Sequence, residues 1–233
     1  RRQLQGSTVD ADVHFNPSYN PWDQRLCLVP NGDLFRALRK GTASVVTDHI
    51  ARFTETGLDL RSGAKLDADV VVTATGLQLK FLGGLSLEVD GKRIEPSNHM
   101  TYKGMMCSDV PNLALAIGYT NASWTLKCDL TCEYVCRILE HMDRTGHTTC
   151  TPKNEDSTVE PLPILDFTSG YVQRALDILP KQGDRPPWQV HQNYLADLRV
   201  LRFGALDDGT LRLLRAGQPL PRTSTEARVT AVG

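Results

Sequence analysis

Three cysteines recur at a spacing of four residues within one expected helix. Cys128, Cys132 and Cys136 would then lie along one stripe of the helix surface, where three thiols could bind a soft metal ion. No C-x-x-C pair or nearby His completes a tetrahedral set of ligands, so packing of small apolar side chains on a buried face is the favoured interpretation. We therefore expect no metal site.

The start of the same helix is a second candidate for chemistry. Asn121, Ala122 and Ser123 come directly before it, so its free backbone N–H groups and the positive end of its dipole could face a ligand that develops negative charge. The alternative is an ordinary Ser or Asn cap, and one Ser could serve both roles. Trp124 could contact a ligand, or it could belong to the core.

The third candidate is the end of a valine-rich segment, residues 69–76. A continuous valine run closed by small residues is typical of a strand buried on both faces. Thr75 and Gly76 would then lie where a doubly wound sheet presents its ligand crevice, and a glycine allows close approach of another backbone or a ligand. A tight strand exit without any ligand explains the same residues.

The remaining sequence predicts the elements that position these candidates. We expect a short helix over 33–40 and a small antiparallel meander made of 43–48, 50–54 and 58–60. A second buried strand at 112–118 leads into the long helix, over 124–142.

Further along, residues 150–163 contain three prolines and several charges, which predicts a linker or surface loop. Helices are expected at 168–179 and 194–203, and a loose tail from Ala216.

Composition excludes several classes of protein. The 233 residues are 40% hydrophobic and 23% charged, enough to bury one sizeable core or two small ones. The net charge of -1 argues against non-specific binding to nucleic acid, and no apolar stretch approaches the roughly 18 to 20 residues that span a bilayer. The six cysteines lack the spacing of a secreted framework. We therefore expect a soluble cytoplasmic chain, and membrane association stays open.

Several familiar motifs are missing. The chain contains no G-x-G, no G-x-S-x-G and no H-x-x-x-H, which argues against a dinucleotide phosphate loop, a hydrolase and a histidine metal site within it. It begins at Arg1 without an initiator Met, so we expect a fragment of a longer protein.

Several longer motifs nevertheless occur in the order of a known family. They are residues 19–27, 70–76, 100–106, 111–124 and 179–183. From about His14 to Leu213 the chain resembles class B flavoprotein monooxygenases, most of all the Baeyer–Villiger monooxygenases of the ethionamide-activating type.

The resemblance implies FAD and NADPH as cofactors, and dioxygen with a ketone, thioether or thioamide as substrates. It matches Arg25 with the family's active-site arginine, beside the flavin and the nicotinamide, and Gln24 with a neighbouring cofactor contact. A permanently charged planar donor suits the negative charge that develops during oxygen insertion. On the residues alone, Arg25 could instead simply pair with Asp23 or another carboxylate.

Further cofactor contacts follow from the resemblance. It implies that the helix start formed by Asn121, Ala122 and Ser123 faces the pyrimidine edge of the flavin. Trp124 is then a candidate for contact with flavin or substrate, and Thr75 and Gly76 for contact with the cofactor.

The fold class implied is α/β, as the C-terminal half of a flavoprotein with two dinucleotide-binding domains, plus a small β-meander and a helical C-terminal extension. We expect residues 1–66 to end the NADPH-binding domain and to include the meander, and 67–150 to form the second part of the FAD-binding domain. The extension would cover 151–215, and a flexible tail 216–233.

The chain also departs from the family. The two glycine loops are absent, as is the fingerprint F-x-G-x-x-x-H-x-x-x-W/Y, because Leu87 stands where its His would follow Phe81. The leading hypothesis is a fragment of an FAD- and NADPH-dependent monooxygenase. The alternatives are an inactive truncated remnant and a pyridine nucleotide flavin reductase without oxygen insertion, although no redox C-x-x-C supports the latter.

Overall fold

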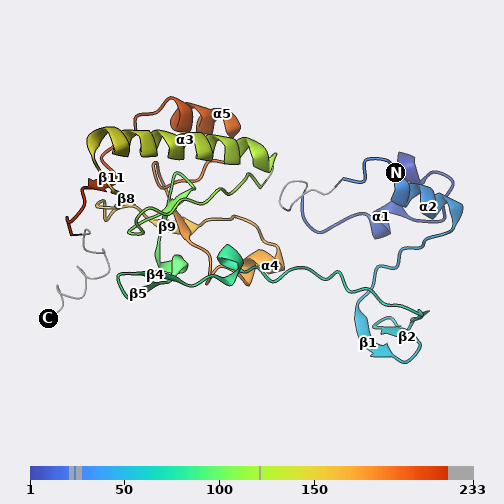
Figure 1. Cartoon of the computed structure of the whole chain (residues 1–233). Coiled ribbons are helices and arrows are strands. Elements are labelled where there is room, and N and C mark those ends of the chain that lie inside the picture. Colours follow the sequence, from blue (N-terminus) through green and yellow to red (C-terminus); the bar gives the residue numbers. More distant parts are fainter. Residues whose placement is uncertain (21–23, 25–27, 121, 220–233) are drawn as a thin grey trace. The chain divides into compact units, whose positions relative to one another are not determined.

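The computed structural model describes residues 1–20, 24, 28–120 and 122–219. They divide into two compact units, unit 1 from Arg1 to Leu77 and unit 2 from Gln78 onward. Within the described residues the fold is α/β, with one three-stranded sheet, four two-stranded sheets and few helices (Figure 1). The expected four-part division of the chain stays a prediction.

Unit 1 contains short helices followed by one small sheet. Its elements are η1 (Arg2–Leu4), α1 (Ala11–His14), α2 (Asp33–Lys40), β1 (Ile50–Thr54), β2 (Gly57–Leu60) and β3 (Lys65–Asp67). The predicted helix over 33–40 is confirmed as α2, and it ends where Gly41 adopts the left-handed conformation.

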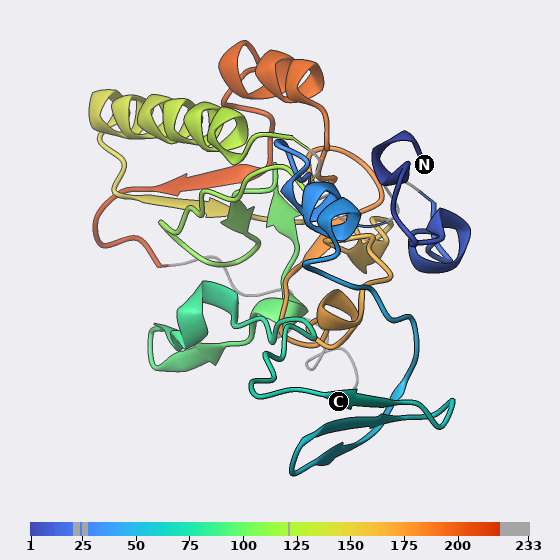
Figure 2. The same cartoon turned by 90° about the vertical axis from the view of Figure 1, so that its right-hand side faces the viewer.

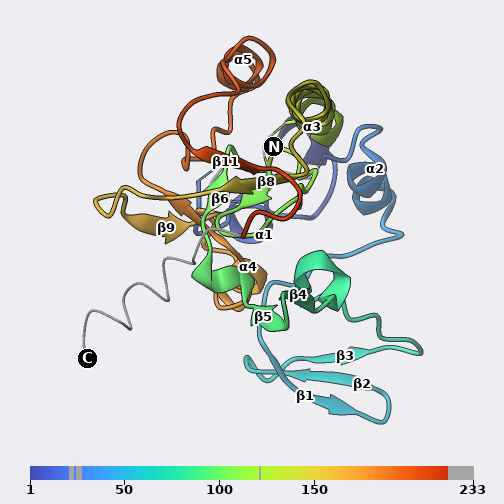
Figure 3. The same cartoon turned by 60° about the vertical axis from the view of Figure 1, so that its left-hand side comes forward.

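The predicted meander is confirmed as an antiparallel sheet in the order β1-β2-β3 (Figure 3). Its third strand is β3, whereas residues 43–48, expected as a strand, form none. Gly57 opens β2 with a φ of 153°, and a Cβ there would lie 1.9 Å from the carbonyl oxygen of Leu66. Only glycine therefore allows β2 and β3 to pair at this point.

The valine-rich segment does not form the predicted buried strand. Residues 70–76 lie in no strand, and Val70 and Val72 are 78% and 82% exposed. The prediction of a second buried strand at 112–118 is also wrong. Like segment 70–76, these residues have no strand partner among the described residues. A strand needs neighbours that complete its ladder of backbone hydrogen bonds, and residue type alone does not supply them.

Unit 2 begins with short elements and is built around one long helix. Its elements are η2 (Phe81–Gly84), β4 (Leu87–Val89), β5 (Lys92–Ile94), η3 (Pro96–Asn98), β6 (Thr101–Tyr102), β7 (Met106–Cys107), α3 (Trp124–Thr145), β8 (Thr149–Pro152), β9 (Pro161–Pro163), α4 (Gly170–Gln173), β10 (Lys181–Gly183), α5 (Tyr194–Asp197), η4 (Leu198–Arg202) and β11 (Leu211–Leu214). The strands pair antiparallel as β4-β5, β6-β7, β8-β11 and β9-β10.

Helix α3 supplies the main face of the core. Leu130, Tyr134, Ile138 and Met142 recur every four residues, so they share one face of the helix, and all are buried. This face packs with Cys150 of β8, with Trp188 and with apolar side chains of β11. In Figure 1 α5 lies along α3. Figure 2 shows the β8-β11 pair beneath α3.

The predicted long helix is confirmed and extends one turn further than expected. It ends at Gly146, which adopts the left-handed conformation and donates its N–H back to the last turn. The helix expected over 194–203 is confirmed as α5 followed by η4, whereas the one expected over 168–179 is regular only in α4.

The prediction of a linker over 150–163 is wrong at both of its ends. Strand β8 pairs with β11, so that Cys150 stands opposite Leu213, and β9 pairs with β10. A proline lacks only the N–H donor, so it can occupy a position in a two-stranded pair whose N–H faces away from the partner. Strand β11 itself was not predicted.

Candidate functional site

The predicted cofactor contacts are distributed over both units. Arg25 and Asn121 lie outside the described residues. Gln24 and Thr75 belong to unit 1, together with Gly76, which has a φ of 115°. The remaining predicted contacts, Ala122, Ser123 and Trp124, belong to unit 2. Their assembly into one site therefore stays a prediction.

The start of α3 is not closed by a side-chain cap. Ser123 occupies the N-cap position, but its Oγ lies 2.7 Å from Thr125 Oγ1 and accepts no backbone N–H. The interpretation of Ser123 as an ordinary cap is therefore wrong. No acidic residue stands in the first turn, so the positive end of the helix dipole is not neutralised within the helix itself.

Trp124 combines an exposed side with a tight contact. Its side chain is 50% exposed, while a Cβ built on Gly118 would lie 2.3 Å from Trp124 Cγ and 2.5 Å from Trp124 Cα. Gly118 therefore allows the backbone before α3 to pass directly against the first residue of the helix. A side chain at position 118 would displace the helix start.

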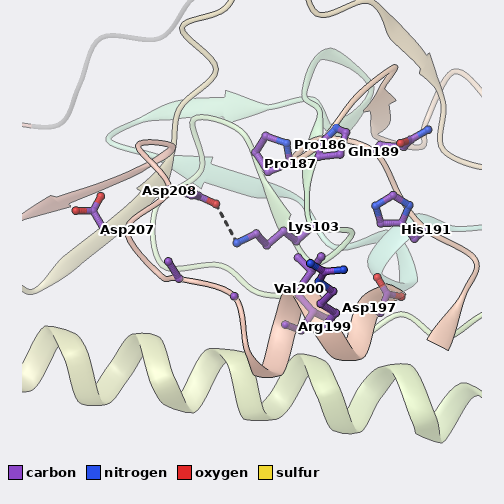
Figure 4. Close-up of a pocket in the computed structure, with 13 residues that line it drawn as sticks. Lys103, Pro186, Pro187, Gln189, His191, Asp197, Arg199, Val200, Asp207 and Asp208 are labelled. Atoms are coloured by element: carbon purple, nitrogen blue, oxygen red, sulfur yellow. Dashed lines mark ion pairs between the residues drawn. The ribbon is translucent and has the colours of Figure 1, made fainter. Parts of the chain in front are cut away.

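A cavity of about 460 Å³ lies within unit 2 (Figure 4). This volume is typical of sites for small organic molecules. Apolar side chains form much of its wall, and several charged or polar ones face it: Lys103, Gln189, His191, Asp197, Arg199, Asp207 and Asp208. None of them was among the predicted site residues.

Lys103, whose side chain is buried, and Asp208, whose side chain is 24% exposed, form an ion pair at this cavity, drawn as a dashed line in Figure 4. Lys103 Nζ lies 2.9 Å from Asp208 Oδ2 and donates to Tyr134 Oη at 2.8 Å. Tyr102 donates its hydroxyl to the same Asp208 oxygen at 2.6 Å, and the two tyrosine oxygens lie 2.9 Å apart. If Tyr134 donates to Tyr102, each of the two tyrosine hydroxyls donates one hydrogen bond and accepts one.

This arrangement fixes the charge states. Burial alone would raise the pKa of Asp208, but hydrogen bonds from Tyr102 and Lys103, together with the positive charge of Lys103, lower it below its ordinary value. Burial, followed by the neighbouring Tyr134 and Asp208, raises the pKa of Tyr102 far above its ordinary range. Asp208 is therefore ionised and Tyr102 neutral near pH 7.

A second buried ion pair approaches the cavity from α3. Lys127 Nζ lies 2.8 Å from Asp197 Oδ2, and both side chains are at most 5% exposed. Tyr119 donates its hydroxyl to the same oxygen at 2.7 Å. Burial and this hydrogen bond raise the pKa of Tyr119 above its ordinary value. The carboxylates of Asp197 and Asp208 are thus each paired with a lysine and hydrogen-bonded by a tyrosine.

The paired charges limit what the cavity can do. Because Lys103, Asp197 and Asp208 already have partners of opposite charge, none of them is free to act as a general base or as a binding site for a single charge.

The cysteine stripe on α3 differs from its predicted environment. Cys128 is half-buried, but Cys132 and Cys136 are exposed, so the prediction that all three pack on a buried face is wrong. In the part of the chain that the structure describes, no three His, Cys, Asp or Glu side chains are placed to hold a metal ion.

Among the described residues, no helix combines the length and the apolar character that crossing a membrane requires.

Comparisons with known proteins identify relatives. No family model matches the chain. It is 54% identical over 211 residues to "FAD-containing monooxygenase EthA" of Mycobacterium tuberculosis. The aligned region covers 91% of this chain and 43% of that protein. It is 53% identical over 210 residues to "Probable FAD-binding monooxygenase AlmA" of Acinetobacter baylyi, covering 90% and 42%. The chain is a homologue of FAD-containing monooxygenases. A third such relative, "Putative FAD-containing monooxygenase MymA" of M. tuberculosis, is 48% identical over 219 residues, covering 94% and 44%.

The resemblance to flavin-dependent monooxygenases predicted from the motifs is thereby confirmed. The chain spans less than half the length of these relatives, 43% in the first case. FAD appears in the relatives' names, whereas NADPH and a substrate do not.

One sequence signal could have found part of this cavity. Lys103 stands between Tyr102 and Gly104 in the motif 100–106, whose other residues are mostly apolar. A lysine in such a run is either exposed or paired in the interior. Its partner Asp208 lies more than a hundred residues away, and no local pattern connects the two.

Proposed function

We propose that this chain forms part of an FAD- and NADPH-dependent monooxygenase that inserts oxygen into ketones or oxidises sulfur. The observation that supports it is identity of about half over nine-tenths of the chain to proteins named as FAD-containing monooxygenases. In this proposal the fold is the C-terminal half of a flavoprotein with two dinucleotide-binding domains.

The residues at the start of α3 fit a flavin in chemical terms. A helix start without a side-chain cap and without a first-turn acid offers backbone N–H donors and positive potential. We propose that Ala122, Ser123 and the preceding Asn121 face the pyrimidine edge of the flavin, with Trp124 beside it. The flavin would supply the oxygen chemistry, and these residues would orient it and stabilise its negative charge.

Other parts of the proposed site lie elsewhere in the chain. Arg25 would act on the flavin and the nicotinamide through its planar, permanently charged guanidinium, with Gln24 as a neighbouring cofactor contact. Thr75 and Gly76 would contact the cofactor at the end of the valine-rich segment. This chain contains no G-x-G loop, so we propose that the FAD pyrophosphate is held by residues outside it.

A chimera tests the proposal. The aligned 211-residue region of the M. tuberculosis relative is replaced by this chain, and FAD content, NADPH oxidation and oxygenation of a ketone and a thioether are measured. We expect bound FAD and oxygenated product. The isolated chain should bind no FAD, and a stoichiometrically yellow protein from it would contradict the assignment of the phosphate loop to other residues.

The chimera also separates the alternatives. A chimera that binds FAD but neither oxidises NADPH nor oxygenates would favour an inactive remnant. Oxidation of NADPH without oxygenated product would favour a flavin reductase. Within an active chimera, Arg25→Ala should abolish oxygenation and leave FAD bound, and Arg25→Lys should restore little activity because a point charge lacks the planar fork of donors.

A further inference from the structure

Two thiols lie next to each other on the outer face of α3. Cys132 and Cys136 are both exposed and are separated by four residues on one continuous helix. Side chains at this spacing share a helix face, with Cβ atoms about 5 to 6 Å apart. The buried face of the same helix, which carries Leu130 and Tyr134, holds the backbone of this region in place.

The other described cysteines are in different surroundings. Cys107 and Cys150 are buried, and burial raises the pKa of each thiol to about 11, so few are thiolates near neutral pH. Cys128 is half-buried. Among the cysteines that the structure describes, only Cys132 and Cys136 are therefore both open to solvent and one helix turn apart.

We propose that Cys132 and Cys136 form a two-thiol binding site for trivalent organoarsenicals, a class of thiophilic ligand. An arsenic(III) centre with one carbon substituent needs only two sulfur donors. Tetrahedral zinc needs four ligands, and no group of three or more candidate ligands exists among the described residues. The ligand class thus follows from the number of donors that the helix presents.

The reaction balances without an oxidant or a reductant. In phenylarsine oxide, arsenic carries one phenyl group and one oxygen. Two S–As bonds form, the arsenic–oxygen bond breaks, and the two thiol protons leave with that oxygen as water. Arsenic stays trivalent throughout. Because both thiols are fixed on one helix, formation of the second S–As bond is intramolecular and benefits from a high effective concentration.

A neighbouring apolar side chain suits an aryl substituent. Leu139 follows Cys136 by three residues, so it lies on the same side of α3, and it is 53% exposed. The phenyl group of the adduct could cover part of this exposed surface. An aryl arsenical should therefore bind more tightly than a methyl arsenical of the same valence.

Intact-mass measurements on the reduced full chain test the proposal. Phenylarsine oxide is added in a Cys27→Ser background, because Cys27 lies outside the described residues. We expect one phenylarsenic adduct per chain, the loss of two reactive thiols, and survival of the adduct in excess monothiol but not in excess dithiol. Cys132→Ser and Cys136→Ser should each weaken binding at least tenfold.

Cys128→Ser is the matched control and should leave binding within about twofold. The melting curves of Cys128→Ser, Cys132→Ser and Cys136→Ser should be alike. A variant that loses binding but keeps its melting curve has lost the site and not the fold. Loss of binding in Cys128→Ser with retention in Cys136→Ser would overturn the assignment, as would retention in all three variants. None of these readouts involves a flavin or catalytic activity, so the outcome is independent of the proposed function.

Discussion

Helix α3 and the valine-rich segment 70–76 both carry apolar side chains, yet these side chains lie in opposite environments. Leu130 on α3 is fully buried, whereas Val70 and Val72 are largely exposed. A helix satisfies its backbone hydrogen bonds within itself and needs only a surface for its apolar face. A strand needs neighbouring strands before its side chains can be buried. The helix could therefore form in this chain, while the segment depends on partners that the described residues do not offer.

The largest effect on the unfolding free energy is expected at the buried ion pair of Lys127 with Asp197 in unit 2. Asp197→Asn leaves Lys127 buried without its counter-ion, which should cost about 3 to 5 kcal/mol of unfolding free energy. Urea unfolding followed by near-ultraviolet circular dichroism measures it. The control is Arg36→Met at the exposed pair of Arg36 with Asp33, expected to cost less than about 1 kcal/mol. Equal effects of the two changes would contradict the contrast between buried and exposed pairs.

A smaller effect is expected from an apolar truncation on the same helix. Leu130→Ala removes a fully buried side chain from the core and should destabilise unit 2 by about 2 to 5 kcal/mol. Leu139→Ala is the matched control, because this leucine lies on the exposed face of α3, and its cost should stay within about 0.5 kcal/mol. Similar costs measured in urea would show that the assignment of the two helix faces is wrong.

These contrasts also explain which parts of the fold could be predicted. Residues 33–40 and 124–142 carry local signals, namely helical spacing and a terminal glycine, and both helices were predicted correctly. Strand β11 was missed because its partner β8 lies some sixty residues earlier, beyond any local pattern. Segment 70–76 was predicted wrongly because valine content indicates the preference for a strand and not the presence of its neighbours.

The candidate site divides in a similar way. The motifs indicated the monooxygenase relatives correctly, because a resemblance depends on residue order and not on contacts. The ion pair of Lys103 with Asp208 was not predicted, since its two members meet only in the folded chain. The environment of Cys132 and Cys136 was predicted wrongly because helical spacing defines a shared face but not which face is buried.

Alkaline pH should destabilise unit 2 on the order of 1 kcal/mol per buried thiol. Burial raises the pKa of Cys107 and Cys150 from an ordinary value of 9.0 to about 11. A group with a raised pKa in the folded state contributes stability that is present below its unfolded pKa and is lost as the pH rises toward its folded pKa. The urea midpoint should therefore fall between pH 9 and 11, in parallel with an absorbance change from thiolate formation.

Substitution of one thiol checks whether the buried cysteines cause this fall of the urea midpoint with rising pH. Cys107→Ala should flatten the decline between pH 9 and 11, whatever its effect at pH 7. The described part of unit 1 offers the contrast, because its perturbed carboxyls are Asp48 and Asp59, whose lowered pKa values affect stability only at acidic pH. An unchanged slope in Cys107→Ala would rule out this thiol as its source.

The smallest effect is expected in the valine-rich segment itself. Val72→Thr keeps the β-branched shape and adds one hydroxyl, so it tests burial without changing strand preference. Because Val72 is 82% exposed, the change should alter the unfolding free energy of this chain by no more than about 0.5 kcal/mol. In the monooxygenase chimera, by contrast, the proposed fold would supply the neighbouring strands that segment 70–76 lacks in this chain. The hydroxyl would then be buried without a partner at a cost of about 1 to 3 kcal/mol. Parallel melting curves of the two proteins compare these values, and an equally small effect in both would mean that added chain does not turn segment 70–76 into a buried strand.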